Sequence, residues 1–105
     1  VGVGIDDKET SLPTSFNLNQ NYPNPFNART ELGFYLAEKS EVAFDIYNIV
    51  GQKIKTLKKG MLEAGFYTVT WDGTNNNGEV VSSGVYFYRL TAGDKTQTKK
   101  MVMLK

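Results

Sequence analysis

Residues 71–90 constrain the fold more than any other part of the chain. They begin with Trp71-Asp72-Gly73, continue through a loop rich in asparagine and glycine, and end in Gly84-Val85-Tyr86-Phe87-Tyr88-Arg89-Leu90. Valine and aromatic residues favour strands, whereas asparagine and glycine tolerate the left-handed backbone angles of turns. The pattern predicts two strands joined by a polar loop. We expect the second strand to bury Tyr86, Tyr88 and Leu90, because the opposite face would bury Arg89.

Alternation of apolar and polar residues predicts strands along most of the remaining chain. The expected strands are residues 16–22, 30–36, 41–48, 53–58, 66–71, 84–90 and 96–105. Residues 30–36 and 41–48 each carry one apolar face and are separated by a short turn, so we expect a hairpin. Residues 59–65 are expected to form a longer connection. Seven short strands with turn signals between them predict an all-β fold, an immunoglobulin-like antiparallel β-sandwich.

The residue types that are missing exclude several classes of site. Without cysteine there is no disulfide framework, iron–sulfur cluster or thiolate zinc site. Without histidine the chain lacks the commonest general base and metal ligand. Twelve basic and eleven acidic residues give a net charge of +1, which predicts no nucleic-acid partner. We therefore expect no enzyme activity, no cofactor and no small-molecule substrate.

Residues 1–15 are polar and acidic without a regular period, which is typical of a linker, and residues 16–105 form the expected domain. An alternative interpretation is that this segment adds an edge strand, because Val1, Val3 and Ile5 alternate with glycine. Because the chain begins with valine rather than methionine, we expect a module of a longer protein. A linker in front of the compact part places that module at the C-terminal end of its parent.

The segment Tyr22-Pro23-Asn24-Pro25-Phe26-Asn27 predicts a stiff corner. Each proline fixes its own φ angle and pushes the residue before it towards an extended conformation. We expect Tyr22 and Phe26 to anchor this corner on the body of the domain. The corner and the Trp71-Asp72-Gly73 motif are both interpreted as structural.

Two other patterns suggest chemistry only weakly. The carboxylates and amides of residues 72–79 could hold calcium, but the sixth position of that loop is Asn77 rather than the glycine of an EF-hand, so a polar hairpin loop is the better interpretation. Tyr35, Tyr47 and Phe66 could form an exposed aromatic strip that stacks on sugar rings.

Three groups of motifs together resemble the type A C-terminal sorting domain of the type IX secretion system. They are the corner with Thr30, the strand and turn at residues 42–52, and a closing half made of Trp71-Asp72-Gly73, residues 83–90 and residues 99–102. Ala28 departs from the family pattern, which usually repeats proline there. The same strand pattern also resembles the immunoglobulin-like domain of flagellar hook-capping proteins.

The resemblance implies a sorting and targeting module of a secreted protein. Such a module is recognised in the periplasm by the outer-membrane type IX translocon, and a sortase-like protease then cuts the linker, here before Phe16. The cargo fused upstream is released or anchored at the cell surface. The signal-bearing residues carried over from the family are Gly84, Tyr86, Lys99, Lys100, Met101, Val102, Met103, Leu104 and Lys105. We also expect the edge of the final strand to be available for pairing with a receptor.

A second hypothesis is a structural or carbohydrate-binding immunoglobulin-like module appended to a secreted enzyme. It differs from the first in predicting retention on polysaccharide and no role in export.

Overall fold

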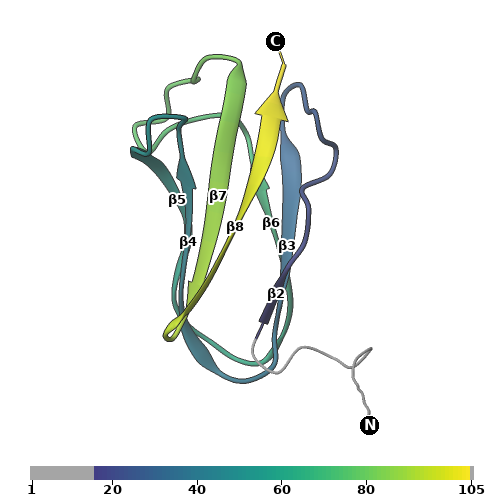
Figure 1. Cartoon of the computed structure of the whole chain (residues 1–105), viewed down its shortest axis with the longest axis vertical. Coiled ribbons are helices and arrows are strands. Elements are labelled where there is room, and N and C mark those ends of the chain that lie inside the picture. Colours follow the sequence, from purple (N-terminus) through teal and green to yellow (C-terminus); the bar gives the residue numbers. More distant parts are fainter. Residues whose placement is uncertain (1–15, 105) are drawn as a thin grey trace, which may run out of the picture.

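The computed structural model describes residues 16–104 and confirms the predicted fold class. Two antiparallel sheets face one another as the layers of an immunoglobulin-like β-sandwich (Figure 1). One sheet has the strand order β2-β3-β6, formed by Phe16–Leu18, Thr30–Leu36 and Gly65–Trp71. The other has the order β5-β4-β7-β8, formed by Lys53–Leu62, Ser40–Tyr47, Gly84–Ala92 and Lys95–Met103. The described part of the chain contains no helix that could cross a membrane. The expected linker at residues 1–15, with its alternative edge strand, lies outside the described residues.

The expected hairpin of residues 30–36 and 41–48 is wrong. β3 pairs with β2 and β6, whereas β4 pairs with β5 and β7, so the chain changes sheets between them. The physical reason is that each strand has one apolar face, and two such faces can be buried by opposing each other across the sandwich. Phe34 and Phe44 do this, with ring centroids 5.3 Å apart in an edge-on arrangement.

The largest differences in strand boundaries are at the ends of β5 and β2. β5 continues to Leu62, so the predicted long connection at residues 59–65 is mostly strand. The strand continues through Gly60 at φ 129°, a backbone angle that residues with a β-carbon rarely adopt. β2 ends at Leu18, and in the described segment that follows only Asn19 and Tyr22 form backbone hydrogen bonds with β3.

The core lies between the inner faces of the two sheets, as the alternation predicted. Tyr86, Tyr88 and Leu90 of β7 are buried, and Arg89 on the opposite face lies over the ring of Tyr47 at 4.4 Å. The largest fully buried side chain is Trp71, at the end of β6. In a domain without disulfides, aromatic packing of this kind supplies much of the stability.

We predict that Trp71→Ala lowers the free energy of unfolding by about 3–5 kcal/mol, because it leaves a cavity that the rigid sheets cannot fill. Urea unfolding followed by circular dichroism measures this loss. Phe66→Ala is the matched control, since Phe66 is an aromatic residue of the same strand that is 82% exposed. A loss below about 1 kcal/mol for Trp71→Ala would contradict the central role of this ring.

Candidate recognition site

Motif residues from four separate segments meet at one end of the sandwich. The ring of Trp71 contacts Phe26 from the corner, with centroids 5.7 Å apart, and Tyr86 from β7, with centroids 5.3 Å apart. The sulfur of Met103 from β8 lies against the backbone of Gly73. We call Phe26, Trp71, Tyr86 and Met103 the closing cluster. All four are buried, so this cluster holds the fold together and presents little surface to a partner.

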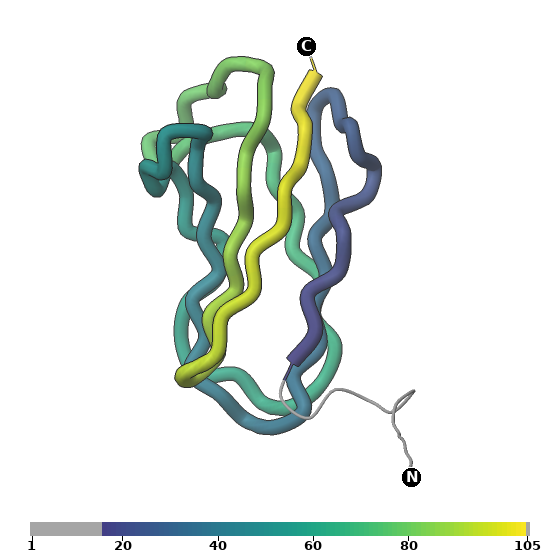
Figure 2. Tube along the Cα trace, viewed as in Figure 1, coloured from purple at the N-terminus to yellow at the C-terminus, as the bar shows by residue number. Residues whose placement is uncertain are grey.

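The proline corner is fastened to the last strand by backbone hydrogen bonds. The Phe26 N–H donates to the Val102 carbonyl at 3.0 Å, and the Leu104 N–H donates to the Phe26 carbonyl at 2.7 Å. The Val102 N–H donates to the Asn24 side-chain oxygen at 3.0 Å. Figure 2 shows the segment between β2 and β3 lying beside the end of β8.

The expectation that the edge of the final strand is free for a receptor is therefore wrong along residues 102–104. The corner already bonds to that edge, as the bonds from Asn24 and Phe26 show. Further along, the Gln20 side chain donates to the Lys100 carbonyl at 2.8 Å. A partner that adds a strand at this edge would have to displace these bonds.

Phe26 anchors the corner as expected, but Tyr22 does not. Phe26 is 1% exposed, whereas Tyr22 is 79% exposed and points away from the body. The anchor on that side is a polar network instead. The Tyr88 hydroxyl donates to the Asn19 carbonyl at 2.7 Å and accepts from the Asn21 N–H at 2.8 Å.

The same network continues to the backbone of Pro23 in the corner. The Asn21 side-chain amide donates to the hydroxyl of Thr30 and to the Pro23 carbonyl, and that hydroxyl donates to the same carbonyl at 2.8 Å. Sequence analysis missed Asn21 and Thr30 as buried anchors. The available signal was the position of Thr30, which is the only polar residue on the inward face of β3.

The Trp71-Asp72-Gly73 motif makes local structural contacts. The Trp71 indole N–H donates to the Thr74 carbonyl at 2.8 Å. The Asp72 carboxylate accepts from the Thr74 hydroxyl at 2.6 Å, and this bond lowers the pKa of Asp72. Gly73 has φ 78°, and a β-carbon there would lie 3.1 Å from the Met103 sulfur.

The loop that follows satisfies its own polar groups. The side-chain oxygen of Asn75 accepts from the N–H groups of Asn77 and Glu79, and the Asn75 amide donates to the Glu79 carboxylate. Within residues 16–104, no group of three or more acidic side chains is arranged to hold a metal ion. The loop is polar, as the sequence favoured, but the expected hairpin is wrong, because β6 and β7 belong to different sheets.

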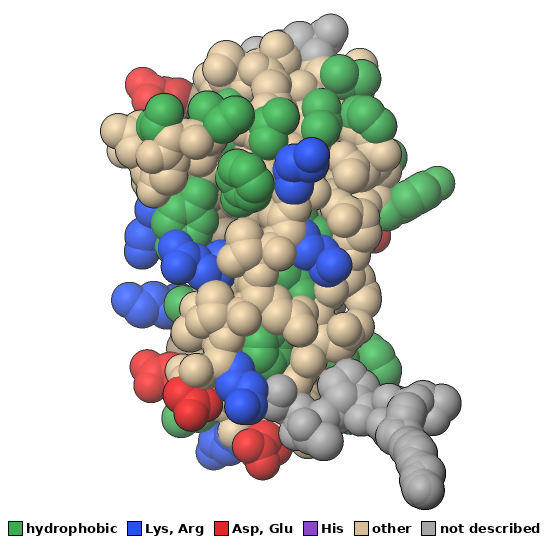
Figure 3. All heavy atoms as spheres, viewed as in Figure 1, with side chains coloured by type: hydrophobic (Ala, Val, Ile, Leu, Met, Phe, Trp, Pro, Cys, Tyr) green, Lys and Arg blue, Asp and Glu red, His purple; other side chains and the backbone are tan. Residues whose placement is uncertain are grey.

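The residues expected to carry the sorting signal fall into two groups. Tyr86, Met101 and Met103 are buried, and Lys99, Val102 and Gly84 are half-buried. Lys100 and Leu104 are exposed, and Lys105 lies outside the described residues. Val102 pairs with Val85 and Lys100 pairs with Phe87, so these side chains share the outer face of the four-stranded sheet. In Figure 3 hydrophobic side chains gather over the upper part of this face.

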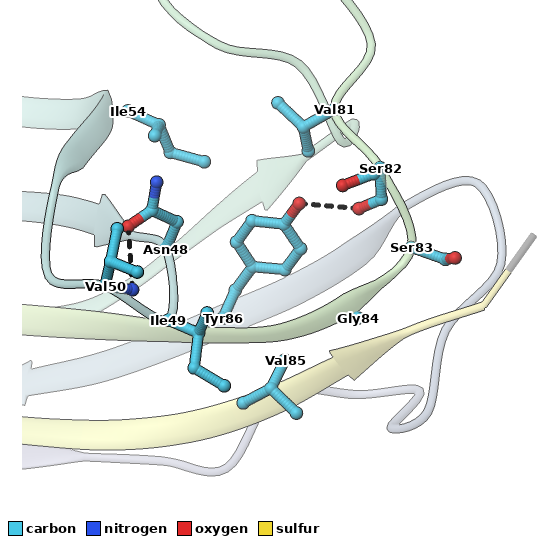
Figure 4. Close-up of a pocket in the computed structure, with 10 residues that line it drawn as sticks. All are labelled: Asn48, Ile49, Val50, Ile54, Val81, Ser82, Ser83, Gly84, Val85 and Tyr86. Carbon is cyan, nitrogen blue, oxygen red and sulfur yellow. Dashed lines mark hydrogen bonds between the residues drawn. The ribbon is translucent and has the colours of Figure 1, made fainter.

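An open pocket of about 490 Å³ adjoins this face at the same end of the molecule. It lies between the turn at residues 48–52 and the segment leading into β7, and Gly84 and Tyr86 help to line it. Figure 4 shows the Tyr86 ring between Val50 on one side and Ser82 on the other, with its hydroxyl directed at the Ser82 carbonyl. The remaining side chains of the pocket are apolar or uncharged, which suits an apolar group of a partner.

The predicted aromatic strip does not form. Tyr35 and Phe66 lie together on the three-stranded sheet with centroids 4.7 Å apart. Tyr47 lies in β4 of the other sheet, because β3 and β4 separate. Of the three predicted residues, Tyr35 and Phe66 share a face and Tyr47 does not.

The sequence model of the FlgD Ig-like domain family matches residues 19–96. Two curated relatives, the basal-body rod modification proteins FlgD of Salmonella typhimurium and Salmonella typhi, are each 41% identical over 44 residues. The aligned stretch covers 42% of this chain and 19% of each relative. The chain therefore matches about a fifth of the length of these proteins.

Three solved structures share the fold. Dimeric latent PorU of Porphyromonas gingivalis superposes with a TM-score of 0.66 at 17% identity, over 85% of this chain and 9% of that one. PorZ, a surface component of the type IX secretion system of the same species, gives 0.57 at 17% identity, over 82% and 11%. FlgD of Xanthomonas campestris gives 0.57 at 20% identity, over 84% and 64%. At these identities the likeness shows the fold alone.

We predict that Gly73→Ala destabilises the domain more than Gly78→Ala does. Both positions have positive φ, so both variants bear a strain of about 1–2 kcal/mol. Only at Gly73 does the new methyl group meet the Met103 sulfur, whereas nothing lies within 4 Å of a β-carbon at Gly78. Thermal and urea unfolding of the two variants measure the difference, and equal losses would contradict the contact.

We also predict that Tyr88→Phe reduces the alkaline loss of stability. Burial raises the pKa of Tyr88 to about 12, above its unfolded value of 10.0, so the folded state favours the neutral hydroxyl. This contribution is present below pH 10 and is lost as the pH rises towards about 12. The free energy of unfolding, measured from pH 8 to about 12, should fall less steeply in Tyr88→Phe than in the wild type. Parallel curves would contradict the prediction.

Proposed function

The chain belongs to the FlgD Ig-like domain family, and from this premise we propose that it is a non-catalytic module with the role of a C-terminal sorting domain of the type IX secretion system. It directs a protein fused upstream across the outer membrane and is then cleaved or anchored at the cell surface. Its partners are the outer-membrane translocon and a sortase-like protease that cuts within residues 1–15. The parent protein passes through the periplasm and ends at the surface or outside the cell.

One observation carries this proposal. The segments that resemble sorting motifs are far apart in the sequence, yet Phe26, Trp71, Tyr86 and Met103 converge at one end of the sandwich. Beside them lie the exposed Lys100 and the pocket that Gly84 and Tyr86 line. A folded label needs such a combination of a rigid base and a small accessible surface. The fold it shares with PorU and PorZ supports the same role.

The recognition surface consists of the accessible residues, while the buried ones fix their positions. Lys100 contributes a positive charge next to the apolar Phe87 and Val102, and the pocket accepts an apolar side chain of the translocon. Removing the whole of residues 100–105 is a poor test, because it also removes Met101 and Met103 from the core. Single surface substitutions separate recognition from folding.

We predict that Lys100→Glu lowers export of a periplasmic reporter fused in front of residues 1–105 in a type IX-competent host. A charge reversal that costs about 1.4 kcal/mol in recognition weakens binding about tenfold. Lys95→Glu is the matched control, because Lys95 is an exposed lysine at the opposite end of the same strand. Export is measured as reporter in the medium and on the surface relative to the periplasm.

Three results would contradict the proposal. The wild-type fusion could be folded and intact yet stay in the periplasm, Lys100→Glu could be exported normally, or the control could fail equally. Urea unfolding of both variants verifies that neither change acts through stability.

The family match favours a second function, a purely structural immunoglobulin-like module of a larger assembly. FlgD of Xanthomonas campestris, which shares the fold, is described in connection with hook capping in flagellar assembly. In this role the module stabilises its parent and carries no export instruction. Weak sugar stacking in this role would use the half-buried Tyr35 and the exposed Phe66. Retention of the wild type on a polysaccharide column, without export of the reporter, would favour this second function.

A further inference from the structure

Every open sheet has edges at which another strand can add, and this sandwich has four edge strands: β2, β6, β5 and β8. Natural β-proteins protect such edges by covering them, shortening them or placing lysine and proline on them. The way each edge is treated therefore indicates where strand addition is permitted.

Two edges of the four-stranded sheet are covered. The corner bonds to β8 through Phe26, as described above. Along β5, the Asn76 N–H donates to the Ile54 carbonyl at 2.9 Å, and the Thr56 N–H donates to the Asn76 side chain at 3.1 Å. β5 also carries four lysines, at residues 53, 55, 58 and 59.

The β2 edge of the other sheet is protected by its length and by a side chain. β2 has only three residues, and its Leu18 N–H donates to the Gln97 side chain at 3.0 Å. Gln97 belongs to β8, so this bond spans the gap between the sheets. A strand adding at β2 would find few free groups.

The remaining edge, β6, has none of these protections within residues 16–104. Its sequence, Gly65-Phe66-Tyr67-Thr68-Val69-Thr70-Trp71, contains no charged residue and no proline. It is rich in β-branched and aromatic residues, which favour strands. Phe66, at 82% exposed, is the most exposed large apolar side chain in the described part of the chain.

The register of the sheet identifies which groups of β6 are free. Tyr22 and Glu31 exchange both backbone hydrogen bonds, so Glu31 directs its N–H and carbonyl away from β6. Alternate residues of an antiparallel ladder face opposite sides, so Thr30 and the other even-numbered residues of β3 bond to β6. Their partners are Gly65, Tyr67, Val69 and Trp71. The backbone groups of Phe66, Thr68 and Thr70 therefore point to the open edge.

We propose that a second copy of this chain adds at this edge, pairing β6 with β6 antiparallel about a two-fold axis through Thr68. In this register Thr68 exchanges hydrogen bonds with Thr68 of the second copy, and Phe66 pairs with Thr70 of the second copy. Identical strands meet without like-charge repulsion because the strand is uncharged. The pairing joins two three-stranded sheets into one continuous sheet and covers the exposed Phe66 ring.

The contact is a strand edge, so the dimer should be weak, with dissociation in the range of about 10 μM to 1 mM. Sedimentation of the full chain over that range should show the mass rising from 11.7 kDa towards twice that value. Hydrogen exchange at the amides of Phe66, Thr68 and Thr70 should slow as the concentration rises, while exchange at Thr91 of β7 should not change.

Three substitutions at Thr68 test the register. Thr68→Pro removes the free N–H on the axis, and Thr68→Lys places two positive charges opposite each other; both should weaken association at least tenfold. Thr68→Val keeps the backbone donor and should associate like the wild type. Because the Thr68 side chain is exposed, all three should fold, and circular dichroism verifies this.

Each of the other outcomes overturns the proposal. If the protein stays monomeric at all concentrations, a second copy does not add at β6, and the edge is open to a different partner. If the amides of Phe66, Thr68 and Thr70 are protected equally at every concentration, a segment of the same chain covers the edge. A dimer that Thr68→Pro and Thr68→Lys leave unchanged uses another surface.

Discussion

The buried contact of Trp71 with Phe26 and Tyr86 is the constraint on which the rest of this structure depends. It joins β6 in one sheet, β7 in the other and the proline corner between β2 and β3. The corner has no regular strand pairing of its own, so this contact holds it together with the bonds to β8 and to Tyr88. Once Phe26 is packed against Trp71, its backbone is placed to bond to Val102 and Leu104, and the last strand is fixed in turn. One aromatic contact thus determines where the accessible end of β8 lies.

The sequence predicted which faces are buried but not which strands are neighbours. The alternation in β7 identified Tyr86, Tyr88 and Leu90 because a period of two is a local property of the chain. Sheet membership is not local. The apolar faces of β3 and β4 are equally satisfied side by side or across the core, and only the whole set of strands decides. For the same reason Tyr35 and Tyr47, which looked like one strip, lie on different sheets.

The residue types at the candidate site could be read from the sequence, but the exposure of each side chain could not. The segments chosen by motif resemblance meet at one end of the sandwich, but the resemblance could not separate buried supports from exposed side chains. Tyr86, Met101 and Met103 are buried, whereas Lys100 is exposed on the same stretch of sheet. Nor could the pattern show that Tyr22 is exposed while Asn21 is buried. The direction of the corner decides which of these two side chains is buried. That direction is set by a hydrogen bond from Asn21 to Tyr88, which is distant in the sequence.

The difference between buried supporting residues and exposed residues explains why one chain matches two functional groups of proteins. The FlgD Ig-like family model matches its sequence, and the structures of PorU and PorZ share its fold, which in this chain is specified by buried aromatics, glycines at positive φ and alternating strands. Those features specify a sandwich, and one sandwich fold can host different roles. A module that is recognised by a partner differs from one that only stabilises an assembly in its accessible residues, which the core does not constrain. In this chain the closing cluster is a requirement of the fold and the base of the surface beside the pocket, so the role of the chain must be argued from that surface and from the unprotected strand edge.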